Sequence, residues 1–192
     1  MARPVTQISS RWKWYSSYNV MEAFMRIQNV STPAYVVDEG KLKENLSLLA
    51  RVEQEAGCKI LLAQKAFSMY AEYPLIGRYL SGTTASGLFE ARLGYEEMHK
   101  ENHVFAPAYH EEEIPELARI CDHMIFNSFS QVQRFAQMAL DENEAARRGQ
   151  HAHGPSALME NAHETTGIQQ HGQVPVLSLG LRINPECSTQ ED

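Results

Sequence analysis

The feature that most constrains this chain is a repeated pattern of short apolar runs, each followed by a helical segment. CKILLAQK precedes FSMYAEYPLIGRYL, SGTTAS precedes GLFEARLGYEEM, HVFAPAY precedes EEEIPELARIC, and HMIFNS precedes FSQVQRFAQMAL. Successive runs lie about 20 to 30 residues apart, the spacing of parallel strands joined by helical crossovers. A last run, VPVLSLGLRINP, has no helical segment after it. The pattern predicts an α/β fold with about four β/α units plus a fifth strand.

The segment before this repeat carries its own signals. STPAYVVD, at residues 31–38, predicts a short β-rich run. Apolar residues from Leu42 to Val52 then recur at helical spacing up to Gly57, which can stop a helix. Within FSMYAEYPLIGRYL, Pro74 should kink or restart the helix.

Two segments stand apart from the regular pattern. Residues 1–30 are predicted to be an N-terminal extension with an amphipathic helix, so that residues 31–192 form the main domain. Residues 141–174 are polar and weakly periodic, and they predict a long surface insertion or mobile loop. The separations of its histidines match no common zinc pattern, so the sequence predicts no metal site. Those histidines are His151, His153, His163 and His171.

Two architectures fit the repeat. In a (β/α)8 barrel of the TIM type, which needs about 250 residues, this chain would supply an incomplete barrel. An open doubly wound sheet fits the length of 192 residues better. However, the turn after CKILLAQK is AFSM rather than a GxGxxG turn, and no GxxxxGK[ST] motif occurs. Nucleotide binding is therefore poorly supported.

The composition argues against several classes of function. A formal net charge of −7 argues against a nucleic-acid-binding surface. No apolar run approaches the roughly 20 residues of a membrane span, and the N-terminus lacks the apolar core of a signal peptide. The cysteines (Cys58, Cys121 and Cys187) are few and far apart, which predicts reduced thiols. These features predict a cytoplasmic protein that does not bind membranes or nucleic acid.

Lys65 is the first candidate for chemistry. It ends the apolar run CKILLAQK, and barrel enzymes place catalytic groups at the carboxyl ends of their strands. A lysine can form a Schiff base with an aldehyde. The alternative is a surface lysine whose ammonium simply leaves the core.

Several segments resemble carboxynorspermidine/carboxyspermidine decarboxylase. They are TPAYVVDEGKLKENL, AGCKILLAQKAFSMY, YLSGTTASGLFEARLGYEE, HVFAPAYHEEEI, HMIFNSFSQ and LGLRINPE, which cover residues 31–140 and 175–186 in order. The resemblance implies a fold type III, alanine-racemase-like enzyme that uses pyridoxal 5'-phosphate. Such enzymes combine a (β/α)8 barrel with a C-terminal β-domain, and the resemblance implies a homodimer when full length. It also implies decarboxylation to norspermidine or spermidine, in polyamine biosynthesis.

The resemblance also implies roles for individual residues. Lys65 matches the lysine that holds the cofactor covalently, and Arg182 falls where relatives place an arginine facing the cofactor ring. Ser86 and Glu90 lie near a motif that relatives use around the cofactor, although Glu90 can also sit on a helix face beside Arg92. The dipeptide at residues 127–128 is expected to cap the next helix.

This sequence departs from the family pattern in ways that keep other functions open. Gln64 replaces an apolar residue, and the family's stacking histidine, glycine-rich phosphate loop and β-domain are expected beyond Asp192. The chain is therefore expected to be a truncated or split form that is inactive by itself. Remaining alternatives are another fold type III decarboxylase such as diaminopimelate decarboxylase, a non-catalytic pyridoxal-phosphate-binding protein, or an inactive fragment.

Overall fold

The computed structural model describes residues 31–152 and 173–184, and the chain divides into two compact units, 1–58 and 59–192. The predicted extension, residues 1–30, lies outside the described part, so its boundary stays a prediction. Residues 31–58 belong to the first of these units, and the predicted domain 31–192 stays a prediction.

Helix α2 (Glu39–Ala56) is the element of the first unit that the structure describes. The Asp38 side chain caps it by accepting a hydrogen bond from the backbone N–H of Lys41. Gly57 ends it at φ 62°, in the left-handed region, and donates its N–H to the Glu53 carbonyl. The predicted stop at Gly57 is therefore confirmed.

Residues 31–38 form no strand, contrary to the sequence prediction. The side chains of Tyr35 and Val36 are exposed. Aromatic and β-branched residues permit an extended backbone, but a strand also needs a neighbour that completes its hydrogen-bond ladder. Among the described residues, nothing pairs with this segment.

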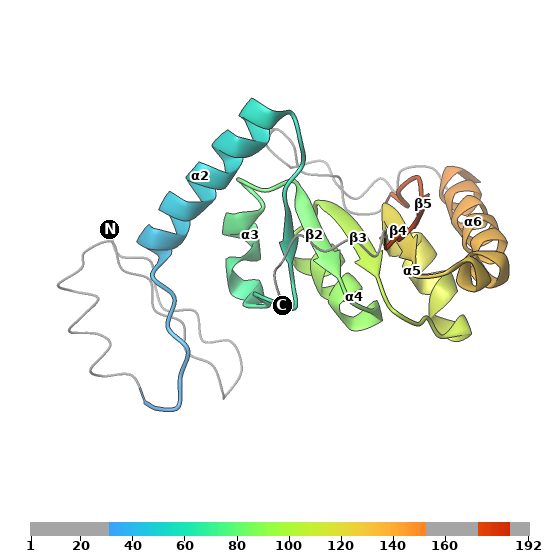
Figure 1. The fold of residues 1–192 in the computed structure, drawn as a ribbon, viewed down its shortest axis with the longest axis horizontal. Helices are drawn as coiled ribbons and strands as arrows, with labels where there is room; N and C mark the ends of the chain where they lie inside the picture. The colour runs from blue at the N-terminus through green and yellow to red at the C-terminus, as the bar shows by residue number, and fades with distance from the viewer. Residues whose placement is uncertain (1–30, 153–172, 185–192) are drawn as a thin grey trace. The chain divides into compact units, whose positions relative to one another are not determined.

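The second unit contains one sheet of five parallel strands in the order β1-β2-β3-β4-β5 (Figure 1). Each strand pairs with the next one in sequence, and the order never reverses, as it would at the switch point of a doubly wound sheet. Four β/α units and a fifth strand are present, as predicted, in the order of an incomplete barrel. The strands are β1 (Leu61–Ala63), β2 (Gly82–Ala85), β3 (Glu101–Phe105), β4 (His123–Phe126) and β5 (Ser178–Leu181).

The crossovers are short except for the last. Pro74 stands in the first turn of α3, so the predicted restart of the helix is confirmed. Proline is tolerated there because the first N–H groups of a helix have no partner within it. The helical elements are η1 (Tyr70–Glu72), α3 (Tyr73–Ile76), α4 (Leu88–Glu97), η2 (Glu111–Glu113), α5 (Ile114–Ile120) and α6 (Phe129–Ala152).

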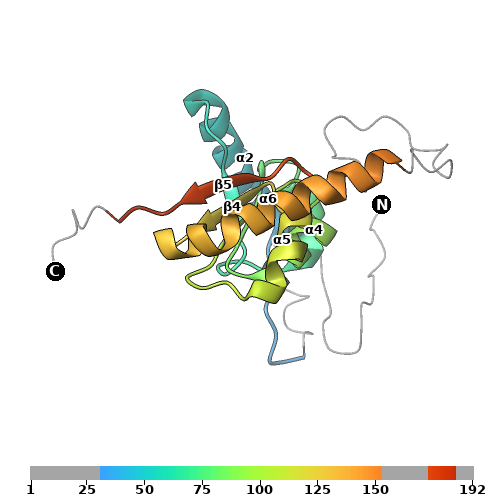
Figure 2. The ribbon, with the colours of Figure 1, turned by 90° about the vertical axis from the view of Figure 1, so that its right-hand side faces the viewer.

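The hydrophobic core lies between one face of the sheet and helices α4, α5 and α6, which lie together on that side (Figure 2). Burial alternates along β3 and β4, since every second residue points into this core. Fully buried strand residues there are Val104, Met124 and Phe126, and the helices contribute Ala91, Leu117 and Phe135. The other residues of β3 and β4, which are only half-buried, form what we call the second face: Glu101, His103, Phe105, His123 and Ile125.

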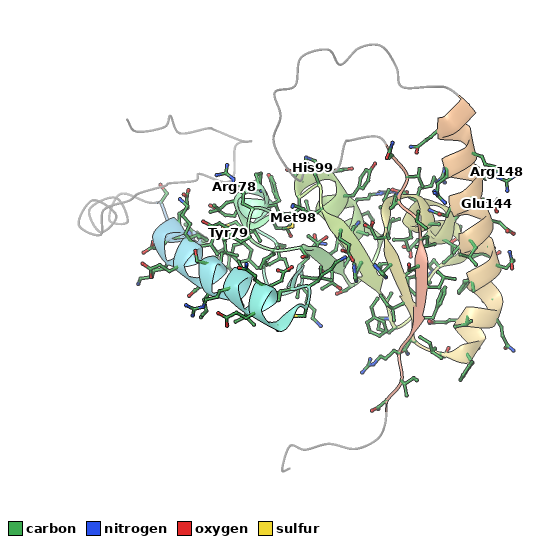
Figure 3. All side chains as sticks on the ribbon, turned by 90° about the horizontal axis from the view of Figure 1, so that it is seen from above. Arg78, Tyr79, Met98, His99, Glu144 and Arg148 are labelled. Atoms are coloured by element: carbon green, nitrogen blue, oxygen red, sulfur yellow. The ribbon has the colours of Figure 1, made fainter. Side chains whose placement is uncertain are left out.

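Helix α6 is longer than the sequence predicted. It continues to Ala152, so residues 141–152 are helical rather than part of a loop; residues 153–172 lie outside the described part. The segment is polar, but it is rich in residues with high helix propensity. Glu144 and Arg148 form an ion pair of 2.7 Å one turn apart along the helix (Figure 3).

Asn143 joins α6 to two other segments. Its side-chain amide donates to the Ala118 carbonyl in α5 (2.7 Å) and to the Pro175 carbonyl (2.9 Å), and its oxygen accepts from the Leu177 N–H (3.3 Å). The residue is 5% exposed. These bonds fix the chain just before β5 against the end of α5.

Replacing Asn143 with alanine is expected to lower the free energy of unfolding by about 2 to 3 kcal/mol, because it leaves buried backbone groups without a partner. Urea denaturation measures the change. Gln137→Ala is the control on the same helix, since Gln137 is exposed and bonds only Asp141 through its side chain. A loss no larger for Asn143→Ala than for the control would show that these hydrogen bonds do not stabilise the fold.

Candidate functional site

Lys65 lies at the carboxyl edge of the sheet, two residues after β1 ends at Ala63, and its side chain is exposed. The Ala63 carbonyl accepts the N–H groups of Ala66 (2.9 Å) and Phe67 (3.2 Å), which closes a turn around the lysine. Among the residues that the structure describes, the Lys65 ammonium forms no ion pair. The amine is thus presented to solvent by a hydrogen-bonded turn.

Gln64 and Tyr73 anchor this turn. The Gln64 backbone N–H donates to the Thr84 carbonyl of β2 (3.2 Å), and its fully buried side chain accepts from the Tyr73 hydroxyl (3.2 Å). The same hydroxyl lies 3.3 Å from the Phe67 carbonyl. Burial, with a smaller contribution from the charge of Glu90, raises the pKa of Tyr73 to about 12, so the hydroxyl keeps its proton. Gln64 stands where the family pattern has an apolar residue. Its side chain accepts a hydrogen bond that an apolar side chain could not accept.

Arg182 follows β5 at the same edge of the sheet. Its backbone N–H donates to the Phe126 carbonyl (2.8 Å), and its guanidinium carbon lies 5.3 Å from the ring centroid of Phe105, at the end of β3. This distance is that of a cation–π contact. The ring holds the exposed guanidinium over the carboxyl edge of the sheet.

The structure places Lys65 and Arg182 at one edge of the sheet but not in contact. They follow the two outer strands, which are about 19 Å apart along a flat sheet at the usual strand spacing. Tyr109 ties the strands between them together, because its buried hydroxyl lies 2.8 Å from the Ile125 carbonyl and 3.1 Å from the Ala106 N–H. Burial raises the pKa of this hydroxyl, which therefore stays protonated.

Near the predicted cofactor motif, the Glu90 carboxylate in the first turn of α4 accepts the Ser86 N–H (2.6 Å), and Arg92 pairs with Glu116 of α5 rather than with Glu90. The Ser128 hydroxyl accepts the Gln131 N–H (3.3 Å), which confirms the predicted capping of α6. At the adjoining position, the Asn127 N–H donates to the Gln131 side chain (2.8 Å), as in a capping box.

A second cluster of polar residues, which the sequence did not reveal, lies toward the opposite edge. Glu101 and His123 begin β3 and β4, and His103 lies in the middle of β3, paired with His123. Glu101 and His103 are two residues apart and so share one face of a strand, a signal that is visible in ENHVF. His123 joins them only through the register that pairs it with His103, which no local pattern shows.

Comparison with known proteins gives relatives for part of the chain, although no family model matches it. Carboxynorspermidine/carboxyspermidine decarboxylase of Campylobacter jejuni is 43% identical over 111 residues, which are 58% of this chain and 29% of that protein. The protein of the same name from Herminiimonas arsenicoxydans is 38% identical over 168 residues, 84% of this chain and 46% of that protein. Carboxyaminopropylagmatine decarboxylase of Synechocystis is 35% identical over 124 residues, 65% of this chain and 32% of that protein.

A solved structure agrees with these matches. The crystal structure of carboxynorspermidine decarboxylase from Campylobacter jejuni, complexed with norspermidine, superimposes with a TM-score of 0.57 at 42% identity. The match covers 59% of this chain and 30% of that one. The matched part of this chain spans less than half the length of each relative. The resemblance inferred from the sequence is confirmed: over part of its length, this chain is similar to carboxynorspermidine/carboxyspermidine decarboxylases.

Proposed function

We propose that this chain carries the lysine-bearing part of a pyridoxal-phosphate-dependent decarboxylase that acts on carboxynorspermidine or carboxyspermidine in polyamine biosynthesis. The observation that carries the proposal is the exposed Lys65 on its hydrogen-bonded turn at the carboxyl edge of a parallel sheet. In barrel enzymes this edge is where catalytic groups lie. The named relatives are decarboxylases of this substrate class.

The chemistry of the side chains at this edge fits pyridoxal phosphate. A primary amine, that of Lys65, can bind an aldehyde covalently. A guanidinium, that of Arg182, can donate hydrogen bonds to an oxygen of the ring or of the phosphate. Both groups are exposed and follow strands of the same sheet.

In the proposed reaction, the cofactor supplies an electron sink for the pair of electrons that remains when the substrate loses its carboxylate as carbon dioxide. Lys65 Nζ would hold the cofactor covalently through its aldehyde carbon, as a primary amine can. The guanidinium of Arg182, which lies against the ring of Phe105, would donate hydrogen bonds to the cofactor. Gln64 and Tyr73 hold the turn that carries Lys65.

Substrate choice is the point on which the relatives differ. Two are named for carboxynorspermidine and carboxyspermidine, and the third is named for carboxyaminopropylagmatine. The first two relatives have the higher sequence identity to this chain, which favours carboxynorspermidine or carboxyspermidine as the substrate. Release of carbon dioxide from the three compounds, compared side by side, ranks them, and a preference for the third would replace the substrate proposed here.

Two further properties stay predictions: a homodimer for the full-length enzyme, and a cytoplasmic location. Within residues 31–152 and 173–184, no helix combines the length and apolarity that a membrane span requires.

Reductive trapping tests the cofactor proposal directly. The chain is incubated with less than one equivalent of pyridoxal phosphate, reduced with borohydride and digested, and mass spectrometry identifies the modified lysine. We expect Lys65 to be labelled ahead of Lys41, Lys43, Lys59 and Lys100, which serve as internal controls. Labelling spread evenly over these lysines would contradict the proposal.

A further inference from the structure

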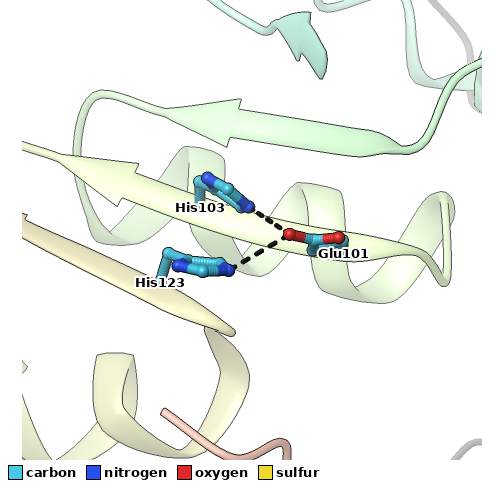
Figure 4. A group of neighbouring side chains, drawn as sticks. All are labelled: Glu101, His103 and His123. Carbon is cyan, nitrogen blue, oxygen red and sulfur yellow. Dashed lines mark hydrogen bonds and ion pairs between the residues drawn. The ribbon is translucent and has the colours of Figure 1, made fainter. Parts of the chain in front are cut away.

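We propose that Glu101, His103 and His123 form a binding site for a divalent transition-metal ion of the zinc class, at the amino edge of the sheet (Figure 4). Each residue offers one ligand atom, and these atoms all lie within 4.8 Å of one another. Glu101 Oε1 is 2.7 Å from His103 Nε2 and 3.2 Å from His123 Nε2. Two imidazole nitrogens and one carboxylate oxygen form a known ligand set for zinc.

The framework of the site is rigid. Glu101 and His103 lie on β3, and His123 begins β4, in register with His103. The two imidazole rings lie with centroids 4.1 Å apart and planes tilted by 36°, and both Nε2 atoms point toward the same carboxylate oxygen (Figure 4). Ligands on paired strands need little ordering when an ion binds, so the entropic cost of forming the site is low.

The environment favours a cation. The Glu101 side chain is 14% exposed and that of His103 is 20% exposed, so a bound ion would be partly shielded from water. A metal ion would bind these side chains as a carboxylate and two neutral imidazoles, so its binding would release any proton held between them.

Lys59 acts on the other oxygen of the same carboxylate. Its ammonium pairs with Glu101 Oε2, whereas both histidines contact Oε1. Lys59 can thus orient the carboxylate without blocking the oxygen that would bind the ion, a role that outer hydrogen-bond partners often have at metal sites. Asp122, which precedes His123, accepts the Asn102 N–H (2.8 Å) and so connects the start of β4 to β3.

This site is separate from the Lys65 edge. Parallel strands run from one edge of the sheet to the other, and Glu101 and His123 begin their strands, whereas Lys65 and Arg182 follow theirs. Three protein ligands leave a fourth position for water. An ion there would link β3 to β4 and stabilise the second face of the sheet.

Calorimetric titration of Zn²⁺ into the full chain tests the proposal, with Co²⁺ as a spectroscopic probe. We expect saturable binding, weakened at least about tenfold by His103→Asn or by His123→Asn. His110→Asn, at an exposed histidine outside the cluster, is the matched control and should bind as the unchanged chain does. Replacing His151, His153, His163 and His171 together by asparagine should also leave this binding in place.

Three results would overturn the proposal: no saturable binding below about 100 μM, binding unaffected by the two cluster variants, or binding lost in the variant that lacks the four histidines between positions 151 and 171. A second experiment uses the unchanged chain, so that it tests the site even if a variant does not fold. Zn²⁺ should protect His103 and His123, but not His110, from carbethoxylation by diethyl pyrocarbonate, as read by peptide mass spectrometry. Equal modification of the three with and without Zn²⁺ would contradict the site.

Discussion

Replacing Lys65 with alanine is expected to abolish covalent attachment of pyridoxal phosphate and to remove the absorption band near about 420 nm that such attachment produces. In this chain, or in any longer form that contains it and releases carbon dioxide from carboxynorspermidine or carboxyspermidine, turnover should fall at least about a thousandfold. The reason is that alanine has no nucleophile to hold the cofactor and to be exchanged for the substrate amine.

The effect of Lys65→Ala is specific only if other lysine variants behave differently. Lys65→Arg keeps a positive charge but cannot form the covalent bond, so it should lose the band as completely as alanine does. Lys41→Ala removes an exposed lysine of α2 whose contact with Asp38 uses only its backbone N–H, and it should keep the band. A band that persists in Lys65→Ala, or that is lost in Lys41→Ala, would place the cofactor elsewhere.

The largest effect on stability is expected at Gly82, the first residue of β2. A Cβ added there would lie 1.9 Å from the backbone oxygen of Glu101 and 2.7 Å from its carbonyl carbon. These atoms belong to the paired strand β3, so relief of the clash requires the two strands to separate. Gly82→Ala should therefore lower the free energy of unfolding by about 3 kcal/mol or more, measured by urea denaturation.

Gly149→Ala is the matched control for Gly82. Gly149 is an exposed residue of α6, and among the described residues nothing beyond its own stretch of helix comes within 4 Å of an added Cβ. Because alanine favours the helix more than glycine does, this variant should be up to about 1 kcal/mol more stable than the unchanged chain. Equal effects at the two positions would show that the close approach of β2 and β3 does not decide the outcome.

The parts of the fold that could be predicted are those with a local signal. The alternation of strand and helix patterns predicted the β/α units. Gly57 predicted the end of α2, and Pro74 predicted the restart of the helix at α3. Residues 31–38 were wrongly predicted as a β-rich run because composition describes what a backbone can adopt, whereas a strand depends on a neighbour distant in sequence. The helical continuation at residues 141–152 was missed because its residues stabilise a helix without an apolar stripe.

The candidate sites, like the elements of the fold, could be predicted only where the sequence carries a local signal. Lys65 could be singled out because it ends an apolar run, and the structure adds the buried anchor, Gln64 with Tyr73, that the sequence left open. The group of Glu101, His103 and His123 depends on the register of two strands whose paired histidines are 20 positions apart in sequence. Register is fixed by packing across the whole sheet, so a linear pattern does not show which of the eight histidines come together.

The hydrogen bonds of Asn143 have a consequence for protein engineering. Together with Gln150, whose side-chain oxygen accepts the Val174 N–H (2.7 Å), Asn143 fixes the chain on both sides of residues 153–172. The start of β5 is then determined by these contacts as well as by its pairing with β4. A redesign of the chain that leads into β5 should therefore keep Asn143 and Gln150, because their side chains hold that chain in place.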